Sequence, residues 1–224
     1  MYKIILCLAL IAFVITLKDF YAPKEKTSYS QENPKTLKKP IEIDAIRKLP
    51  ETYCVTFGSP DAKIKVVEYF SFTCPHCLAL FRNDFKKIKA HFIDTSDICW
   101  VFHPVPQDVI TLQAMTCFEK LNPKEKRVFL NAILEEALIE SPQFSTELMI
   151  KAMEAFEKPL PRLQEKKFIE QTSAFEEAFQ FLKNNMFIDA LPSVEINGMY
   201  YEREVPDMEF ISQQITQNKE SHAF

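Results

Sequence analysis

The feature that most constrains this chain is a pair of cysteines two residues apart, Cys74 and Cys77, with Pro75 and His76 between them. The pair follows an apolar run, Ile64 to Phe70, whose composition is typical of a strand covered on both faces. Pro75 suits the first position of a helix, because its missing N–H would have no helical partner there. The sequence therefore predicts a strand, a short loop and a helix that begins at the two thiols.

Two cysteines at this spacing can close a small disulfide ring. At a helix N-terminus the free N–H groups and the helix dipole favour an anion, so the Cys74 thiolate should be stabilised. The side chain of His76 can add a donor or a positive charge, which would lower the Cys74 pKa further and make the disulfide easier to reduce. Redox chemistry is the prediction, with an inert structural disulfide and a zinc site as alternatives. A structural zinc site needs four ligands, and the other candidates are scattered singly: Cys54, Cys99, Cys117, His91 and His103.

Three further cysteines lie in apolar surroundings, where a reduced thiol packs as a small hydrophobe. Cys54 and Cys99 are expected in strands and Cys117 in a helix, all three as buried free thiols, with a Cys99–Cys117 bridge as the alternative. His103, at the end of a predicted strand, is expected to be structural.

Composition excludes several functions. Lys and Arg number 27 against 31 Asp and Glu, a net charge of -4, so the chain has no excess of positive charge with which to bind nucleic acid. The chain has only two glycines, Gly58 and Gly198, and they are too far apart for a P-loop or a dinucleotide-binding turn. No metal and no organic cofactor is expected.

The N-terminal segment predicts export. Residues 4–17 carry no charge and follow Lys3, as in the apolar part of an export signal. The cleavage site at Ala22-Pro23 is poor, so residues 1–22 are predicted to be either a signal peptide or an uncleaved membrane anchor, with a buried core helix as the remaining alternative. Residues 23–50, rich in Lys, Pro, Ser and Thr, are predicted to be a flexible linker.

The remaining residues predict an α/β fold. The expected strands are Tyr53–Phe57, Ile64–Phe70, Ile98–Phe102, Ser193–Ile196 and Met199–Tyr201. The last two should form a hairpin around Asn197-Gly198. One helix should begin at Pro75, and the other expected helices are Lys124–Glu140, Thr146–Glu157, Phe168–Met186 and Asp207–Gln217. The Met and Phe stripes of these helices, which include Phe175 and Phe179, are predicted to be core.

The run Val66 to Cys77 (VVEYFSFTCPHC) resembles the active-site strand and helix start of the DsbA-like thiol:disulfide oxidoreductases of the bacterial periplasm. A second match, Ala190 to Gly198, is similar to the cis-proline loop, strand and hairpin of that family. The resemblance implies a thioredoxin-like fold with an inserted α-helical domain. Residues 51–106 and 187–224 would form the thioredoxin-like domain, and residues 107–186 the insertion.

The resemblance also implies roles for single residues. Cys74 would be the exposed nucleophile and Cys77 its buried partner, with Pro192 as the cis-proline beside their disulfide. The backbone of Leu191 would bind an extended substrate. Glu68 would be a buried acid beside Cys77 that can exchange protons with it, and the alternative is an acid at the strand end that reaches solvent.

By this resemblance the protein introduces disulfide bonds into unfolded exported proteins with free cysteines and is reoxidised by a DsbB-like membrane partner. It would be a monomer in the periplasm, soluble or tethered to the inner membrane by residues 4–21. Two alternatives remain at this point: a disulfide reductase or isomerase that uses the same cysteines, and a thioredoxin-like chaperone or binding module. An isomerase would be expected to carry a dimerisation domain, for which residues 23–50 look short and polar.

Overall fold

The computed structural model describes residues 41–42, 47–139, 145–159, 161–185, 188 and 190–221. Within these residues six strands form one mixed sheet in the order β1-β6-β5-β3-β4-β2. The strands are β1 (Ile41–Glu42), β2 (Val55–Phe57), β3 (Ile64–Phe70), β4 (Ile98–Pro104), β5 (Ser193–Ile196) and β6 (Met199–Tyr201). Strands β3 and β4 are parallel, and every other neighbouring pair is antiparallel. The predicted α/β class is confirmed.

The apolar run that precedes the cysteines forms β3, at the centre of the sheet between β4 and β5. Val66 and Phe70 belong to the core on one face, and Val67 and Tyr69 belong to the core on the other. Every β3 residue except Lys65 is buried. The prediction of a strand covered on both faces is confirmed, and the loop that follows this strand leads directly into the cysteine pair.

Helices before and after the insertion cover the face of the sheet that carries the cysteines. Helix α2 (Pro75–Leu80) continues through a π-helical turn, Phe81–Phe85, into α3 (Lys86–Ile88), and a second π-helical turn, Lys89–Ile93, follows. Helix α9 (Met208–Ser221) packs on the same core through Phe210, Ile211 and Ile215.

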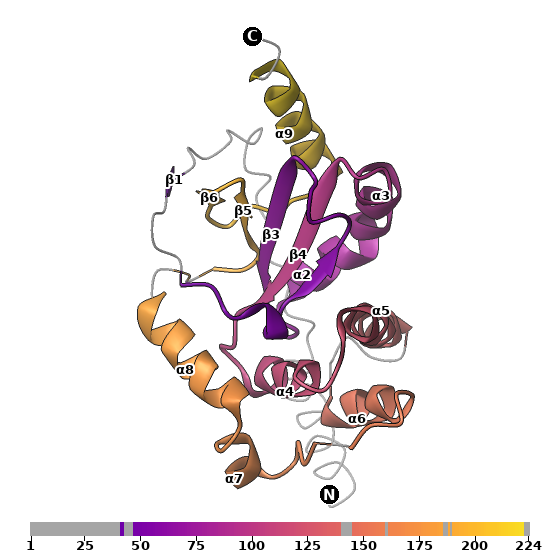
Figure 1. The fold of residues 1–224 in the computed structure, drawn as a ribbon, viewed down its shortest axis with the longest axis vertical. Coiled ribbons are helices and arrows are strands. Elements are labelled where there is room, and N and C mark those ends of the chain that lie inside the picture. The colour runs from indigo at the N-terminus through magenta and orange to yellow at the C-terminus, as the bar shows by residue number, and fades with distance from the viewer. Residues whose placement is uncertain are drawn as a thin grey trace, which may run out of the picture. The chain divides into compact units, whose positions relative to one another are not determined.

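The inserted helices lie between β4 and β5 in the sequence and gather at one end of the sheet (Figure 1). They are α4 (Val109–Phe118), α5 (Pro123–Ile139), α6 (Thr146–Glu154), α7 (Lys166–Ile169) and α8 (Ser173–Asn184). The thioredoxin-like fold with a helical insertion is therefore present in the described residues.

One predicted helix is interrupted. The periodic pattern from Phe168 to Met186 predicted a single helix, but the chain forms α7 and then α8. The hydroxyl of Thr172 accepts a hydrogen bond from the N–H of Phe175 at 3.2 Å and so caps the start of α8. Thr172, which lies at a position of the same helical period, is therefore the N-cap that separates the two helices.

The apolar stripe of α8 also faces another way than predicted. Phe175 and Phe179 were expected in the core, but their exposed fractions are 36% and 55%, and Val128 of α5 is 53% exposed. The buried face of α8 consists of smaller residues and one aromatic ring: Ala174, Ala178 and Phe181.

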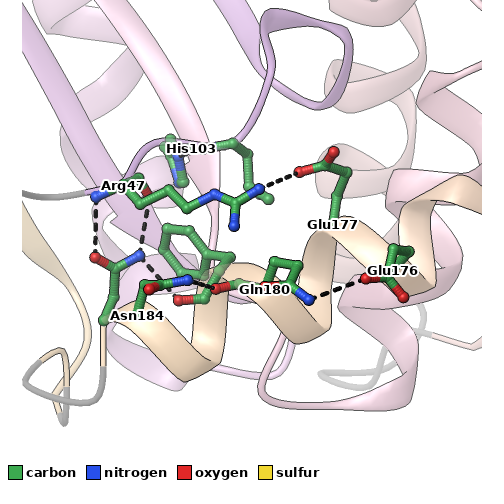
Figure 2. A network of polar contacts seen from close by, with 9 residues as sticks. Arg47, His103, Glu176, Glu177, Gln180 and Asn184 are labelled. Carbon is green, nitrogen blue, oxygen red and sulfur yellow. Dashed lines mark hydrogen bonds and ion pairs between the residues drawn. The ribbon is translucent and has the colours of Figure 1, made fainter.

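Residues 47–49 form a strap that holds the start of the domain, although the sequence predicted a flexible linker to residue 50. The N–H and C=O of Arg47 bond to the side-chain amide of Asn185 at 3.1 and 2.8 Å. The Arg47 guanidinium donates to Glu177 at 3.3 Å (Figure 2). Leu49 is buried, and its N–H donates to Nε2 of His103 at 2.9 Å.

Strand β1 also falls within the predicted linker, where Ile41 and Glu42 pair with β6. The folded part therefore begins earlier in the sequence than Tyr53, where the sequence predicted its start. Residues 1–40 and 43–46 lie outside the described part, and the predicted signal or anchor lies there with them. Of the helices that the structure describes, none is long and apolar enough to cross a membrane.

Candidate active site

Cys74 is the N-cap residue of α2, in extended backbone conformation (φ -81°, ψ 113°). Its Sγ atom accepts a hydrogen bond from the N–H of Cys77 at 3.3 Å. Pro75 fills the first helical position and has no N–H, so the next amides of the turn, those of His76 and Cys77, are the ones directed at the sulfur. The thiol lies at the positive end of the helix, as the sequence predicted.

These contacts lower the pKa of Cys74 from 9.0 to about 7. The largest cause is a hydrogen bond from the Cys77 thiol; the amides of Cys77 and His76 add to it, while burial opposes them. Two pH units correspond to about 3 kcal/mol of preference for the thiolate, and about half of Cys74 is thiolate at neutral pH. His76 acts here through its backbone N–H, whereas the sequence interpretation had relied on its side chain, which is exposed.

Cys77 shows the opposite behaviour. Its side chain is 4% exposed, and burial is the largest cause that raises its pKa. The hydrogen bond that it gives to Cys74 and the negative charge of Glu68 raise the pKa further. The pair is therefore asymmetric: the Cys74 sulfur favours the thiolate, and the Cys77 sulfur keeps its proton. Cys74 is itself buried, at 9% exposed, so the expectation of an exposed nucleophile is wrong.

Glu68 lies on β3 and is 1% exposed, so the alternative of an acid that reaches solvent is wrong. The indole N–H of Trp100 donates to its carboxylate at 3.2 Å. Burial raises the pKa of Glu68 to about 8; the bond from Trp100 opposes this shift, and the charge of Cys74 adds to it. Each thiol is thus coupled electrostatically to this carboxyl group, which carries a proton at neutral pH most of the time.

The Leu191-Pro192 peptide bond is cis, which confirms the prediction for this loop. Pro192 is buried and Leu191 is half-buried. Strand β5 begins at the next residue, Ser193, which pairs with Tyr69 near the end of β3. The loop therefore lies beside the strand end from which the chain continues to Cys74.

A polar cluster that the sequence did not predict lies next to the cysteine loop, formed by Ser71, Thr73, Asp108 and Thr111; we refer to it as the Asp108 cluster. Three hydroxyl groups donate to Oδ2 of Asp108, at 2.7 Å from Ser71, 3.1 Å from Thr73 and 2.8 Å from Thr111. Part of this could have been predicted, because a lone Asp between a proline-rich turn and an apolar run is typical of a helix N-cap.

The other three cysteines of the described residues take no part in this site. Cys54, Cys99 and Cys117 are free and buried, which confirms the prediction of buried thiols. Cys99 and Cys117 belong to the cores on opposite faces of the sheet, so the alternative bridge between them does not form. In the described part of the chain, no three His, Cys, Asp or Glu side chains lie together as ligands of a metal ion would.

Comparison with known proteins agrees with the fold. The profile of the thioredoxin family matches residues 51–216. A Rickettsia bellii protein with the provisional name protein-disulfide oxidoreductase is 41% identical over 73 residues, which is 28% of this chain and 28% of that protein. A Rickettsia felis protein of the same name is 32% identical over 112 residues, or 49% of this chain and 38% of that protein. The matched segments therefore span well under half the length of these relatives.

Solved structures resemble a larger part of the chain. Oxidised BdbD of Bacillus subtilis matches with a TM-score of 0.59 at 21% identity, over 76% of this chain and 95% of that one. A variant of α-DsbA1 of Wolbachia pipientis matches with a TM-score of 0.56 at 22% identity, over 75% and 92%. DsbA of Chlamydia trachomatis matches with a TM-score of 0.53 at 21% identity, over 86% of this chain and 100% of that one. The likeness identifies the fold as that of the DsbA proteins.

Proposed function

Because this chain belongs to the thioredoxin family and carries a thiol pair at the start of a helix, we propose that it introduces disulfide bonds into exported proteins with free cysteines. The observation that carries the proposal is the asymmetry of the pair. Stabilisation of the Cys74 thiolate favours the reduced form of the protein over its disulfide, so the disulfide passes readily to another dithiol.

The reaction begins from a Cys74–Cys77 disulfide. A client thiolate attacks Sγ of Cys74, a bond forms between the client sulfur and Cys74, and the bond to Cys77 breaks with its electron pair on Cys77. That sulfur has a raised pKa and takes a proton, which the carboxyl group of Glu68 can supply because its own raised pKa keeps it protonated at neutral pH.

The second step releases the client. A second client thiolate attacks the client sulfur of the mixed disulfide, the client disulfide forms, and Cys74 leaves as a thiolate. A thiol with a lowered pKa is the better leaving group, which suits Cys74 to this step. The client loses two electrons and the protein gains them.

The loop before β5 suits client binding. Pro192 has no N–H to form a further backbone bond, and it lies beside the end of β3 that leads to the cysteines. In this proposal the backbone of Leu191 pairs with an extended client segment while the client sulfur approaches Cys74.

Two measurements test the proposal: the reduction potential of the Cys74/Cys77 couple against glutathione, and the oxidation of a reduced, unfolded protein by the purified disulfide form. Cys74→Ser should abolish the reaction. Cys77→Ser should leave a thiol at position 74 that accumulates mixed disulfides with oxidised partners, since no inner thiol can release them. A potential near that of thioredoxin, about -270 mV, together with failure to oxidise the substrate, would replace the oxidase with a reductase or an isomerase. Unchanged client folding in both single variants would favour a chaperone module.

The compartment and the partner are also proposals. An export signal or anchor at residues 4–21 would place the domain in the periplasm, where a DsbB-like membrane protein could reoxidise it. Cell fractionation with N-terminal sequencing tests the location: an intact Met1 in the membrane fraction supports the anchor, and a cytoplasmic pool refutes export. Gel filtration tests the expected monomer.

A further inference from the structure

Asp108 joins the cysteine loop to the inserted helices. One carboxylate oxygen, Oδ1, accepts the N–H of Thr111 at 2.8 Å and so caps the start of α4. The other oxygen, Oδ2, accepts the three hydroxyl groups of the Asp108 cluster, two of which, from Ser71 and Thr73, belong to the loop that follows β3. A single side chain therefore fastens the loop before Cys74 to the first turn of the insertion.

Ser71 links the hydrogen bonds of Asp108 to both thiols. Its C=O accepts the N–H of Cys74 at 3.2 Å, and its own N–H donates to the sulfur of Cys77. The next residue, Phe72, donates its N–H to the hydroxyl of Thr111 at 3.2 Å. The backbone that places the two sulfurs is thus bonded through the Asp108 cluster to α4.

We propose that Asp108 is a positioning residue of the redox centre, which holds residues 71–73 so that the Cys74 sulfur meets the amide donors of α2. The inference rests on the proposed redox role of the cysteines and adds to it a role for the inserted domain.

An ordinary helix cap would not need this arrangement. The N-caps of α6 and α8, Ser145 and Thr172, each accept one N–H of their own helix, and Asn122, just before α5, accepts two. Asp108 makes the same bond with one oxygen and uses the second for hydroxyl groups of two separate elements. A carboxylate oxygen only accepts, whereas an amide nitrogen in its place would offer two hydrogens and no acceptor for the three hydroxyls.

The variant Asp108→Asn separates the two functions. Asparagine caps a helix as well as aspartate does, so α4 should keep its cap. The three hydroxyl groups lose their common acceptor, and the loop should loosen. We expect the Cys74 pKa, read from the ultraviolet absorbance of the thiolate, to rise by about one unit; the thiolate fraction at neutral pH would then fall from about one half to about one tenth. The couple should become more reducing.

The direction of the shift is informative. Removal of a negative charge near Cys74 would by itself favour the thiolate and lower its pKa. A rise of the Cys74 pKa in the Asp108→Asn variant therefore cannot come from the lost charge. It shows instead that residues 71–73 no longer hold the Cys74 sulfur against its amide donors.

Ser145→Ala is the matched control, because it removes the cap of α6 without a bond to the cysteine loop. It should lower the unfolding free energy by about 1 kcal/mol and leave the Cys74 pKa and the reduction potential unchanged. An unchanged or lowered Cys74 pKa in Asp108→Asn would show that Asp108 only caps α4, and so would an equal rise in Ser145→Ala. Failure of the wild-type protein to oxidise a substrate would refute the proposed function instead, since the thiolate measurement does not depend on a client.

Discussion

Glu68 is a buried carboxyl group, and its replacement by Gln should stabilise the reduced protein at neutral pH but not at acid pH. Its pKa is about 8 in the fold, against 4.5 for the ordinary group, so the folded state binds more protons than the unfolded state between these values. The contribution of Glu68 to the free energy of unfolding is therefore fully present below about pH 4.5, and it is lost as the pH rises towards 8.

The size of the effect follows from the shift. pH 7 lies about 2.5 units above 4.5, the ordinary pKa of the group. At about 1.36 kcal/mol per unit, the free energy of unfolding that wild type loses between these pH values is about 3 kcal/mol. Glutamine carries no charge at any of these pH values, and its side-chain oxygen can still accept the indole N–H of Trp100. Glu68→Gln should therefore be more stable than wild type by about 3 kcal/mol at pH 7 and equally stable near pH 4.

Urea unfolding followed by circular dichroism, at several pH values and in a reducing agent that keeps both thiols reduced, measures this difference. Glu154→Gln, at an exposed position on α6, is the control and should match wild type throughout. If the free energies of unfolding of Glu68→Gln and wild type differ by the same amount at pH 4 and pH 7, the reasoning is refuted, because the difference then comes from packing and not from ionisation. A gap that closes at pH 7 would place the carboxyl group in a polar environment.

Three further predictions concern single residues. Since the backbone N–H of His76 donates to Cys74 while its side chain is exposed, His76→Ala should raise the Cys74 pKa by less than about half a unit; a larger rise in the thiolate titration would assign the stabilisation to the imidazole. Burial lowers the pKa of His103 to about 3, so the fold loses stability as the pH falls below about 6.5. Between pH 7 and pH 5 the free energy of unfolding of His103→Gln should fall by about 2 kcal/mol less than that of wild type in the same urea assay. Gly58→Ala should lower the unfolding free energy by roughly 1–3 kcal/mol, because φ is +89° and a Cβ would lie 2.7 Å from a backbone oxygen of β4. Gly198→Ala, also at positive φ but with no atom within 4 Å, should cost less.

The elements that were predicted well are those whose signal lies within a few residues. The apolar run of β3 and the Asn197-Gly198 turn, with φ values of 49° and 88°, needed no knowledge of the rest of the chain. The stripe of α8 was different, because periodicity shows that a helix has an apolar face but not whether another element covers it. Phe175 and Phe179 are apolar and periodic, and they remain exposed.

The same distinction applies to the active site. Cys74 and Cys77 are neighbours on one helical turn, so their asymmetry could be predicted from the spacing and the helix start. The link from Ser71 to Asp108 joins residues 37 positions apart and depends on how α4 meets the sheet. The strap at residues 47–49 likewise depends on partners more than 50 positions away, so its polar sequence predicted only a linker.

The order of the strands has a consequence for a chain that leaves a ribosome or a membrane channel N-terminus first. Strand β3 is completed by β5, whose Ile196 pairs with Val66 across 130 positions of sequence. The cysteines thus emerge long before the proline loop and β5, and until then β3 has one unpaired edge. Until β5 pairs with β3, the thiols of Cys74 and Cys77 lie in an incomplete site and can react with oxidants and with neighbouring chains. In the proposed function, the final stretch of the polypeptide, which contains no cysteine, therefore determines when the two thiols can begin selective exchange with clients.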